Sequence, residues 1–231
     1  MVVGTGRSGT NHLSSVLNDL GIDVAHEALG EDGISSWCLV SSLEQAPYGP
    51  ALTDINTEEY VVGHQLRNPI KTVPSLMTIN KKSWAFIRED AKERTAPWWW
   101  NRAPIRVKAM WHWLDWNQRA DEMAEVHWTL DQAPQIGPTL AEAMEEPKLE
   151  EVWEDAWNSF ESPENSAITR VTSFSRMLKT SPAVAIQRVR HAMKWTPVTE
   201  EALFDADPIL AADMMSYWHE FKKRTAIAHS N

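Results

Sequence analysis

The chain has 231 residues, of which 43% are hydrophobic and 23% are charged, and its formal net charge is −10 at pH 7. This length suits one sizeable core, so a single domain over residues 1–231 is expected. The acidic balance argues against a nucleic-acid surface, and no apolar run is long enough to span a membrane. Because Cys38 is the single cysteine and no leader pattern precedes the first motif, a cytoplasmic protein is expected.

The first elements expected along the chain form a strand–loop–helix unit. Val2 and Val3 are β-branched and lead into a glycine-rich loop. Apolar residues at spacings of three and four predict a helix that begins at Thr10 and ends at Gly21. Residues 22–25 follow as a second short strand, so the pattern predicts a βαβ unit.

The rest of the chain continues this alternation and then becomes helical. After a loop around Gly33, a strand is expected over 60–66, helices over 70–79, 81–95 and 104–125, and a strand over 126–130. Helical patterns dominate residues 135–231, and Asp207-Pro208 is typical of a helix start. The pattern predicts an α/β fold with a short parallel sheet, flanking helices and a helix-rich C-terminal half.

The loop at residues 4–10 reads GTGRSGT and has the character of a phosphate-binding segment. It spells G-x-G-x-x-G, typical of dinucleotide-binding proteins, and also G-x-x-x-x-G followed by threonine, a Walker loop without its lysine. The missing lysine argues against a kinase or an ATPase. Asp23 and Glu27 lie near the position of the ribose-binding acid, so an NAD(P)-binding Rossmann-type protein stays open.

A third ligand is favoured because Arg7 stands inside the loop, two residues before Gly9. It joins Ser8, Thr10 and the first N–H groups of the helix as a set of donors for a phosphosulfate. Here the sequence resembles the sulfotransferases that use 3′-phosphoadenosine 5′-phosphosulfate (PAPS), in particular bacterial and phage members with a GRSGT loop. The resemblance implies a three-layer P-loop-like fold, and it implies cofactor binding by Gly6, Arg7, Ser8, Gly9, Thr10 and Asn11.

A second motif supports the resemblance. The family binds the 3′-phosphate of the cofactor with an arginine at a strand end and a serine eight residues later, and Arg67 and Ser75 have this spacing. A turn followed by two helical turns can bring both side chains to one phosphate. Pro74 departs from the pattern, because proline removes a hydrogen bond from the helix.

The likeness is good over residues 1–80, including the segments 24–27 and 32–37, and faint beyond residue 135. The family's final Arg-Lys-Gly cofactor motif is not found. Basic side chains within residues 176–195 either replace it or form a basic helical face, namely Arg188, Arg190 and Lys194. The family requires no metal and no ligand cluster is evident in the sequence, so no metal is expected.

Sulfuryl transfer to a hydroxyl needs charge stabilisation and a general base. Arg7 is expected to stabilise the transferring group. Glu27 is the preferred base, since it ends the strand expected beside that of the loop, where open α/β sheets bind ligands. His26 is the second candidate because another branch of the family uses histidine, and a solvated carboxylate is the alternative for Glu27. His12 and His64 are expected to be structural.

Tryptophan is frequent, with 13 residues. On the helix expected over 104–125, one stripe with Trp113 and Trp116 is typical of a core, whereas Trp111 falls on the opposite face with Arg119. Together with residues 98–100, Trp111 forms either an aromatic platform for the acceptor or a lid that packs on itself or on another subunit.

The leading hypothesis is therefore a PAPS-dependent sulfotransferase whose acceptor is a hydroxyl of a small molecule, carbohydrate or glycolipid, with residues 81–125 as an acceptor lid. The alternatives are an NAD(P)-binding protein and a non-catalytic or shortened PAPS-binding relative, because only residues 1–3 precede the loop. Neither a nucleic-acid partner nor stable membrane insertion is expected, and the sequence is compatible with an oligomer.

Overall fold

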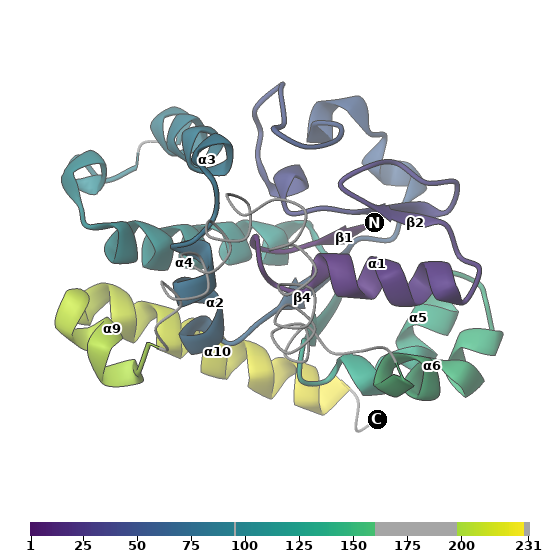
Figure 1. The fold of residues 1–231 in the computed structure, drawn as a ribbon. Coiled ribbons are helices and arrows are strands. Elements are labelled where there is room, and N and C mark those ends of the chain that lie inside the picture. Colours follow the sequence, from purple (N-terminus) through teal and green to yellow (C-terminus); the bar gives the residue numbers. More distant parts are fainter. Residues whose placement is uncertain (95, 160–197, 229–231) are drawn as a thin grey trace, which may run out of the picture.

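A five-stranded parallel sheet forms the centre of the computed structural model, which describes residues 1–94, 96–159 and 198–228 (Figure 1). The strand order is β2-β3-β1-β4-β5. The strands are β1 (Val2–Val3), β2 (Val24–His26), β3 (Gly33–Ser35), β4 (Gly63–Leu66) and β5 (Val126–Thr129). The expected α/β fold, with helices on a short parallel sheet, is confirmed.

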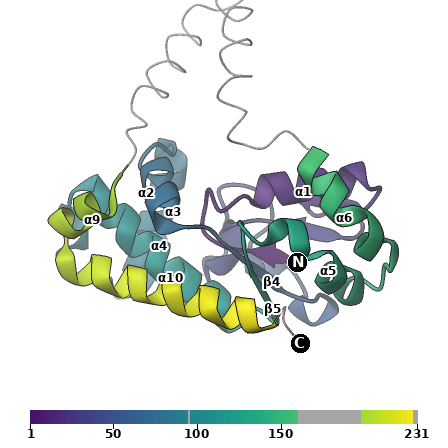
Figure 2. The same ribbon diagram turned by 90° about the horizontal axis from the view of Figure 1, so that it is seen from below.

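The helices form two groups (Figure 2). The first group contains α1 (Thr10–Asp19), α5 (Gly137–Ala143) and α6 (Lys148–Ser159). The second contains α2 (Pro69–Leu76), α3 (Lys81–Glu93), α4 (Ile105–Met123), α9 (Glu200–Ala206) and α10 (Pro208–Ala228). No helix within the described ranges is both long enough and apolar enough to cross a membrane.

The two side chains of β1 pack against helices on opposite faces of the sheet. Val2 packs with Leu13 and Leu17 of α1, while Val3 packs on the opposite face with Trp116 and Ala120 of α4. Successive side chains of a strand point to opposite faces, so each valine is buried in a different cluster. The sheet is therefore the middle of three layers.

A third apolar cluster holds the helix-rich half to the sheet. Leu66 of β4 packs with Trp113 of α4, with Val73 of α2 and with Phe221 of α10, and all four are fully buried. The expected start of the last helix is confirmed, because α10 begins at Pro208 after an aspartate. That aspartate, Asp207, accepts a hydrogen bond from the backbone N of Leu210 at 3.0 Å.

The structure corrects the expected loop around Gly33. That segment contains β3, which pairs in parallel with both β2 and β1. Three residues are too short to show a periodic pattern, and no helix separates β3 from β2 to mark a new unit. One consequence is that β2 is not adjacent to β1, although the sequence indicated that it was.

Candidate functional site

The glycine-rich loop follows the carboxyl end of β1 and leads directly into α1, the edge where open α/β sheets bind ligands (Figure 1). Gly9 is the N-cap of α1 with a left-handed φ of 106°, and no side chain of the described residues caps this helix. The first turn of α1 also carries no acidic residue. The N–H groups and the positive end of the helix dipole therefore favour an anion at this place.

Gln65 of β4 holds the glycine-rich loop by a hydrogen bond to its backbone. Its Nε2 donates to the backbone O of Ser8 at 2.9 Å, and its Oε1 accepts from Trp128 Nε1 at 3.1 Å. A Cβ at Gly4 would lie 2.5 Å from the backbone O of Gln65, and one at Gly9 would lie 2.8 Å from Gln65 Nε2. Both positions require glycine because the loop backbone approaches β4 so closely.

Two hydroxyl groups inside the loop have no hydrogen-bond partner among the described residues. Thr5 Oγ1 and Ser8 Oγ are both buried, and each side chain is 0% exposed. Burying a hydroxyl without a partner destabilises a fold by about 1–3 kcal/mol, so such groups are rare and favour a ligand-binding role. Thr10 is also buried, while Arg7 and Asn11 are exposed.

Arg67 brings the second sequence motif to the loop. It directly follows β4, and its Nη1 donates to the backbone O of Arg7 at 3.1 Å. Its own carbonyl accepts from Trp113 Nε1 at 3.2 Å, which holds the backbone of the strand end. Asn68 then caps α2 by accepting from the backbone N of Ile70. The guanidinium of Arg67, predicted from one motif, therefore lies against the backbone of Arg7, predicted from the other.

Ser75 lies in the last turn of α2 and is half-buried. Its carbonyl accepts from Thr78 Oγ1 at 2.7 Å, which ties the end of the helix to the following turn. Pro74 is buried within α2, and the helix nevertheless runs without a break from Pro69 to Leu76. Whether Ser75 shares a phosphate with Arg67 stays a prediction.

Glu27 follows β2 with a left-handed φ of 56°, which is unusual for a residue other than glycine. Its Oε1 accepts from Trp37 Nε1 at 2.9 Å and lies 3.8 Å from His26 Nε2. The side chain is 25% exposed, so it is held in place without being closed off from solvent. Backbone strain of this kind is concentrated at functional sites.

Glu27 does not stand beside the loop's own strand as the sequence indicated, because β3 lies between β2 and β1. Trp37, which follows β3, spans this separation. Its ring lies 3.6 Å from where a Cβ of Gly6 would be, and its indole N–H binds Glu27. Trp116 Nε1 donates to the carbonyl of Trp37 at 2.8 Å. No role for Trp37 was predicted from the sequence, although its segment belongs to the resemblance.

The tryptophans of the expected lid do not form one exposed platform. Trp98 is 82% exposed, but Trp100 is buried and its ring packs edge-on against Trp111 at 5.9 Å. This arrangement fits a lid that packs on itself.

Arg119, expected beside Trp111 on a polar face, is instead buried. It forms ion pairs with Asp90 of α3 at 2.8 Å and with Asp115 at 2.7 Å. Helix α4 therefore has buried residues on nearly all sides. Only the apolar stripe with Trp113 and Trp116 was predicted from the sequence.

His12 and His64, expected to be structural, are both buried. His12 packs edge-on against Trp157 with ring centroids 4.5 Å apart. The basic residues proposed to complete the cofactor site, Arg188, Arg190 and Lys194, lie outside the described residues.

A cavity of about 430 Å³ lies at the opposite, amino ends of the strands. It is lined by Met1, Val24, Gly63 and Val126, among others. Since the loop follows the carboxyl end of β1, this cavity does not belong to the site built around it.

Comparison of the chain with family models, with curated proteins and with solved structures gave no match. The function therefore has to be argued from the site itself.

Proposed function

We propose that this protein is a PAPS-dependent sulfotransferase that acts on a hydroxyl of a small molecule or glycan. The observation that carries the proposal is the contact between Arg67 and the backbone O of Arg7, 60 residues apart in the sequence. It joins the loop, which suits a 5′-phosphosulfate, to the strand-end arginine, which suits a 3′-phosphate. A ligand with two separate anionic groups explains both motifs.

The residues present fit this cofactor. Among the described residues, no side chain caps the N-terminus of α1 and none is hydrogen-bonded to the hydroxyls of Thr5 and Ser8, and both features suit a phosphate group. Glycines at positions 4 and 9 keep the loop backbone close to β4, so that its N–H groups can surround an anion. Bound PAPS would supply an activated sulfuryl group.

In this proposal each part of the site has a distinct role. Arg7 stabilises the negative charge of the transferring group, and Arg67 with Ser75 binds the 3′-phosphate. The remaining cofactor contacts come from the loop and the start of α1, namely Gly6, Ser8, Gly9, Thr10 and Asn11.

Glu27 accepts the proton of the acceptor hydroxyl, and His26 is the second candidate for this role. Trp37 is a positioning residue, because its indole N–H holds the Glu27 carboxylate.

The sheet topology disfavours the NAD(P)-binding alternative. In the Rossmann order 3-2-1-4-5-6, the strand that carries the ribose-binding acid lies next to β1. Here β3 occupies that place, so Glu27 is two strands away from the loop strand. Asp23 precedes β2, and its Oδ2 accepts from the backbone N of Glu31 at 2.9 Å, so it lies at the wrong end of the strand.

Calorimetric titration with adenosine 3′,5′-bisphosphate, with NADH and ATP as comparison ligands, tests the proposal. We expect selective binding of the bisphosphate, and we expect Arg67→Ala to weaken it more than tenfold, because one charge-assisted contact contributes about 1.5–3 kcal/mol. Arg88→Ala is the matched control, since Arg88 is an exposed arginine of α3. A preference for NADH, or equal losses in the two variants, would contradict the proposal.

Transfer itself is tested separately from binding. PAPS is incubated with alcohol, phenol and sugar acceptors, and release of the bisphosphate is followed. Acceptor-dependent release identifies an enzyme, whereas tight binding without transfer to any acceptor would favour the non-catalytic relative.

A further inference from the structure

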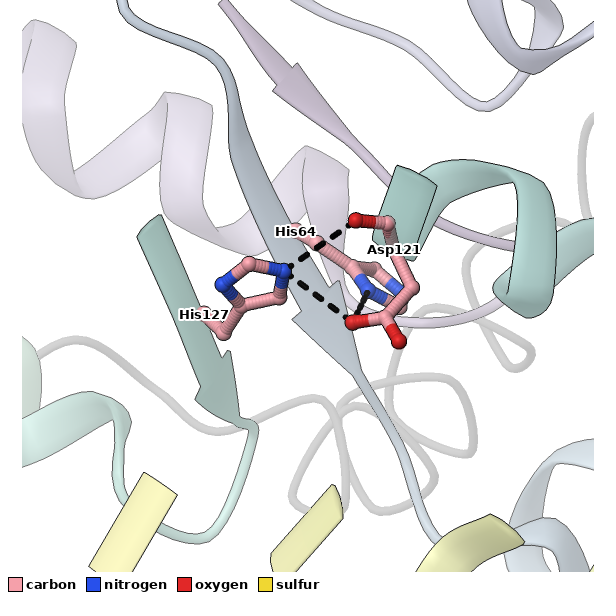
Figure 3. A group of neighbouring side chains, drawn as sticks. All are labelled: His64, Asp121 and His127. Carbon is pink, nitrogen blue, oxygen red and sulfur yellow. Dashed lines mark hydrogen bonds and ion pairs between the residues drawn. The ribbon is translucent and has the colours of Figure 1, made fainter. Parts of the chain in front are cut away.

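Three side chains with metal-binding atoms meet on the face of the sheet that packs against α4 and α10 (Figure 3). They are His64 of β4, His127 of β5 and Asp121 of α4, and one ligand atom of each lies within 4.8 Å of the other two. His64 and His127 are direct neighbours in the parallel pairing of β4 with β5, so both imidazoles leave the sheet on the same side.

The hydrogen bond of His64 Nε2 with Asn117 determines the tautomer of His64. Asn117 Nδ2 donates to the backbone O of Trp113 at 2.7 Å, which leaves Asn117 Oδ1 as an acceptor. His64 Nε2 lies 3.1 Å from that oxygen and therefore carries the proton. Metal-binding histidines are typically oriented by such a donated N–H.

His64 Nδ1 consequently presents a bare lone pair inside the protein. It has no hydrogen-bond partner among the described residues, and the side chain is 0% exposed. The nearest acidic atom is Asp121 Oδ1 at 4.0 Å, which is also an acceptor. Two acceptors facing each other in a buried place are unfavourable unless a cation lies between them.

The side chains of Asp121 and His127 also point toward His64 Nδ1 (Figure 3). Asp121 Oδ1 lies 3.0 Å from His127 Nε2, while Asp121 Oδ2 accepts from Arg224 Nη2 of α10 at 2.8 Å. If His127 Nε2 carries a proton, it can donate to Asp121, whose backbone O lies 3.4 Å away and whose Oδ1 lies 3.0 Å away, but His64 Nδ1 is still left without a donor. A metal ion satisfies all three ligand atoms at once.

We propose that His64 Nδ1, His127 Nε2 and Asp121 Oδ1 bind a divalent transition-metal ion of the Zn²⁺ type. Two imidazoles and one carboxylate are a ligand set that Zn²⁺ and neighbouring metals prefer. Around a tetrahedral ion with bonds of about 2.1 Å, ligand atoms lie about 3.4 Å apart. The 3.0 and 4.0 Å separations here lie on either side of that value, so small side-chain movements close the site.

The sequence pattern suggested no metal because the three ligands come from separate elements with no motif spacing. The site is distinct from the phosphate-binding loop, since Gln65, the residue after His64, points to the other face of the sheet and holds that loop. The bound ion would join β4, β5 and α4, with Phe221 of α10 packed edge-on against His64 at 5.0 Å. Its expected effect is therefore on stability.

Titration of the chelator-treated protein with Zn²⁺ tests this site. We expect one tight equivalent by calorimetry, at least about 100-fold weaker binding in His127→Gln, and a rise in Tm with Zn²⁺ only where the site is intact. Replacement by Co²⁺ should give the visible absorption of a four- or five-coordinate ion. His219→Gln is the matched control, because His219 is an exposed histidine of α10.

Asp121→Asn is the second variant, in case His127→Gln does not fold, because it removes the charge with little change in volume. It should lose the tight equivalent and the Co²⁺ absorption as well. The proposal is overturned if the parent protein takes up no tight equivalent of Zn²⁺, or if a folded variant of either ligand binds Zn²⁺ as the parent does.

Discussion

At the scale of single residues, the side chains around Glu27 hold it in one orientation. Its left-handed backbone leaves the end of β2 at an unusual angle, and a Cβ at Gly49 would lie only 2.2 Å from its carbonyl O. Trp37 donates to its carboxylate and also packs against Gly6 of the loop. One indole therefore relates the position of the proposed base to that of the loop.

Replacing Trp37 by phenylalanine should separate its hydrogen bond to Glu27 from its packing against Gly6. The ring still packs against Gly6, but the hydrogen bond to Glu27 is lost, so we expect the transfer rate to fall about tenfold with bisphosphate affinity unchanged. Initial rates and calorimetry check this, with Glu27→Gln as the reference for loss of the base. Trp98→Phe, at an exposed tryptophan, should leave both quantities unchanged. Loss of bisphosphate affinity in Trp37→Phe would show that the residue supports the loop instead.

At the scale of elements, a buried ion pair fastens α3 to α4. Arg119 pairs with Asp90, which also accepts from Ser41 Oγ at 2.5 Å. Arg119 Nη1 donates to the carbonyl of Val40 at 3.0 Å. Two helices and the loop after β3 thus meet at one guanidinium, which explains why a charged residue lies inside this layer.

Arg119→Met should lower the free energy of unfolding by about 3–5 kcal/mol, because it leaves the Asp90 carboxylate buried without its cation. The double variant with Asp90→Leu should recover part of this loss, since it removes the 1% exposed carboxylate, while the Asp115 side chain is 23% exposed and keeps contact with solvent. Urea unfolding measures both. If the double variant were as unstable as the single one, packing around the guanidinium, rather than the charge of Asp90, would be responsible.

Much of the element order followed from the sequence, because helices such as α1 have apolar residues at spacings of three and four and the motif around Arg67 marks a strand end. The three residues of β3 carried no such signal. The burial of Arg119 depends on Asp90, whose proximity only the tertiary structure reveals. The same holds for the site: the loop and Arg67 were evident as motifs, whereas the role of Trp37 and the cluster around Asp121 arise from packing between distant segments.

At the scale of the whole molecule, a histidine enclosed by aromatic rings makes stability depend on pH. His112 is fully buried beside Trp37, Trp84 and Trp116, and neither ring nitrogen has a hydrogen-bond partner within the described ranges. Burial lowers the pKa of His112 to about 3, from the ordinary 6.5. The native state therefore keeps this imidazole neutral in weakly acidic solution.

Stability should fall as the pH is lowered from 6.5 toward 3, because the unfolded chain gains a proton on this histidine that the native state does not. The contribution is about 1.4 kcal/mol per pH unit for one group. Unfolding by urea at several pH values between 7 and 4.5 measures it. His112→Phe should reduce the slope by that amount, and the exposed His219→Gln should not. An unchanged slope in His112→Phe would contradict the assigned pKa.

The two-residue strand β1 has a consequence for how the protein folds. It lies between β3 and β4, both of which come later in the chain, and pairs with each in parallel. During synthesis the loop and α1 emerge before β3 and β4, so their supporting neighbours are absent until Leu66 has been made. Contacts so distant in sequence form slowly because a long loop must close first. The loop and α1 are therefore made well before they can take their native conformation.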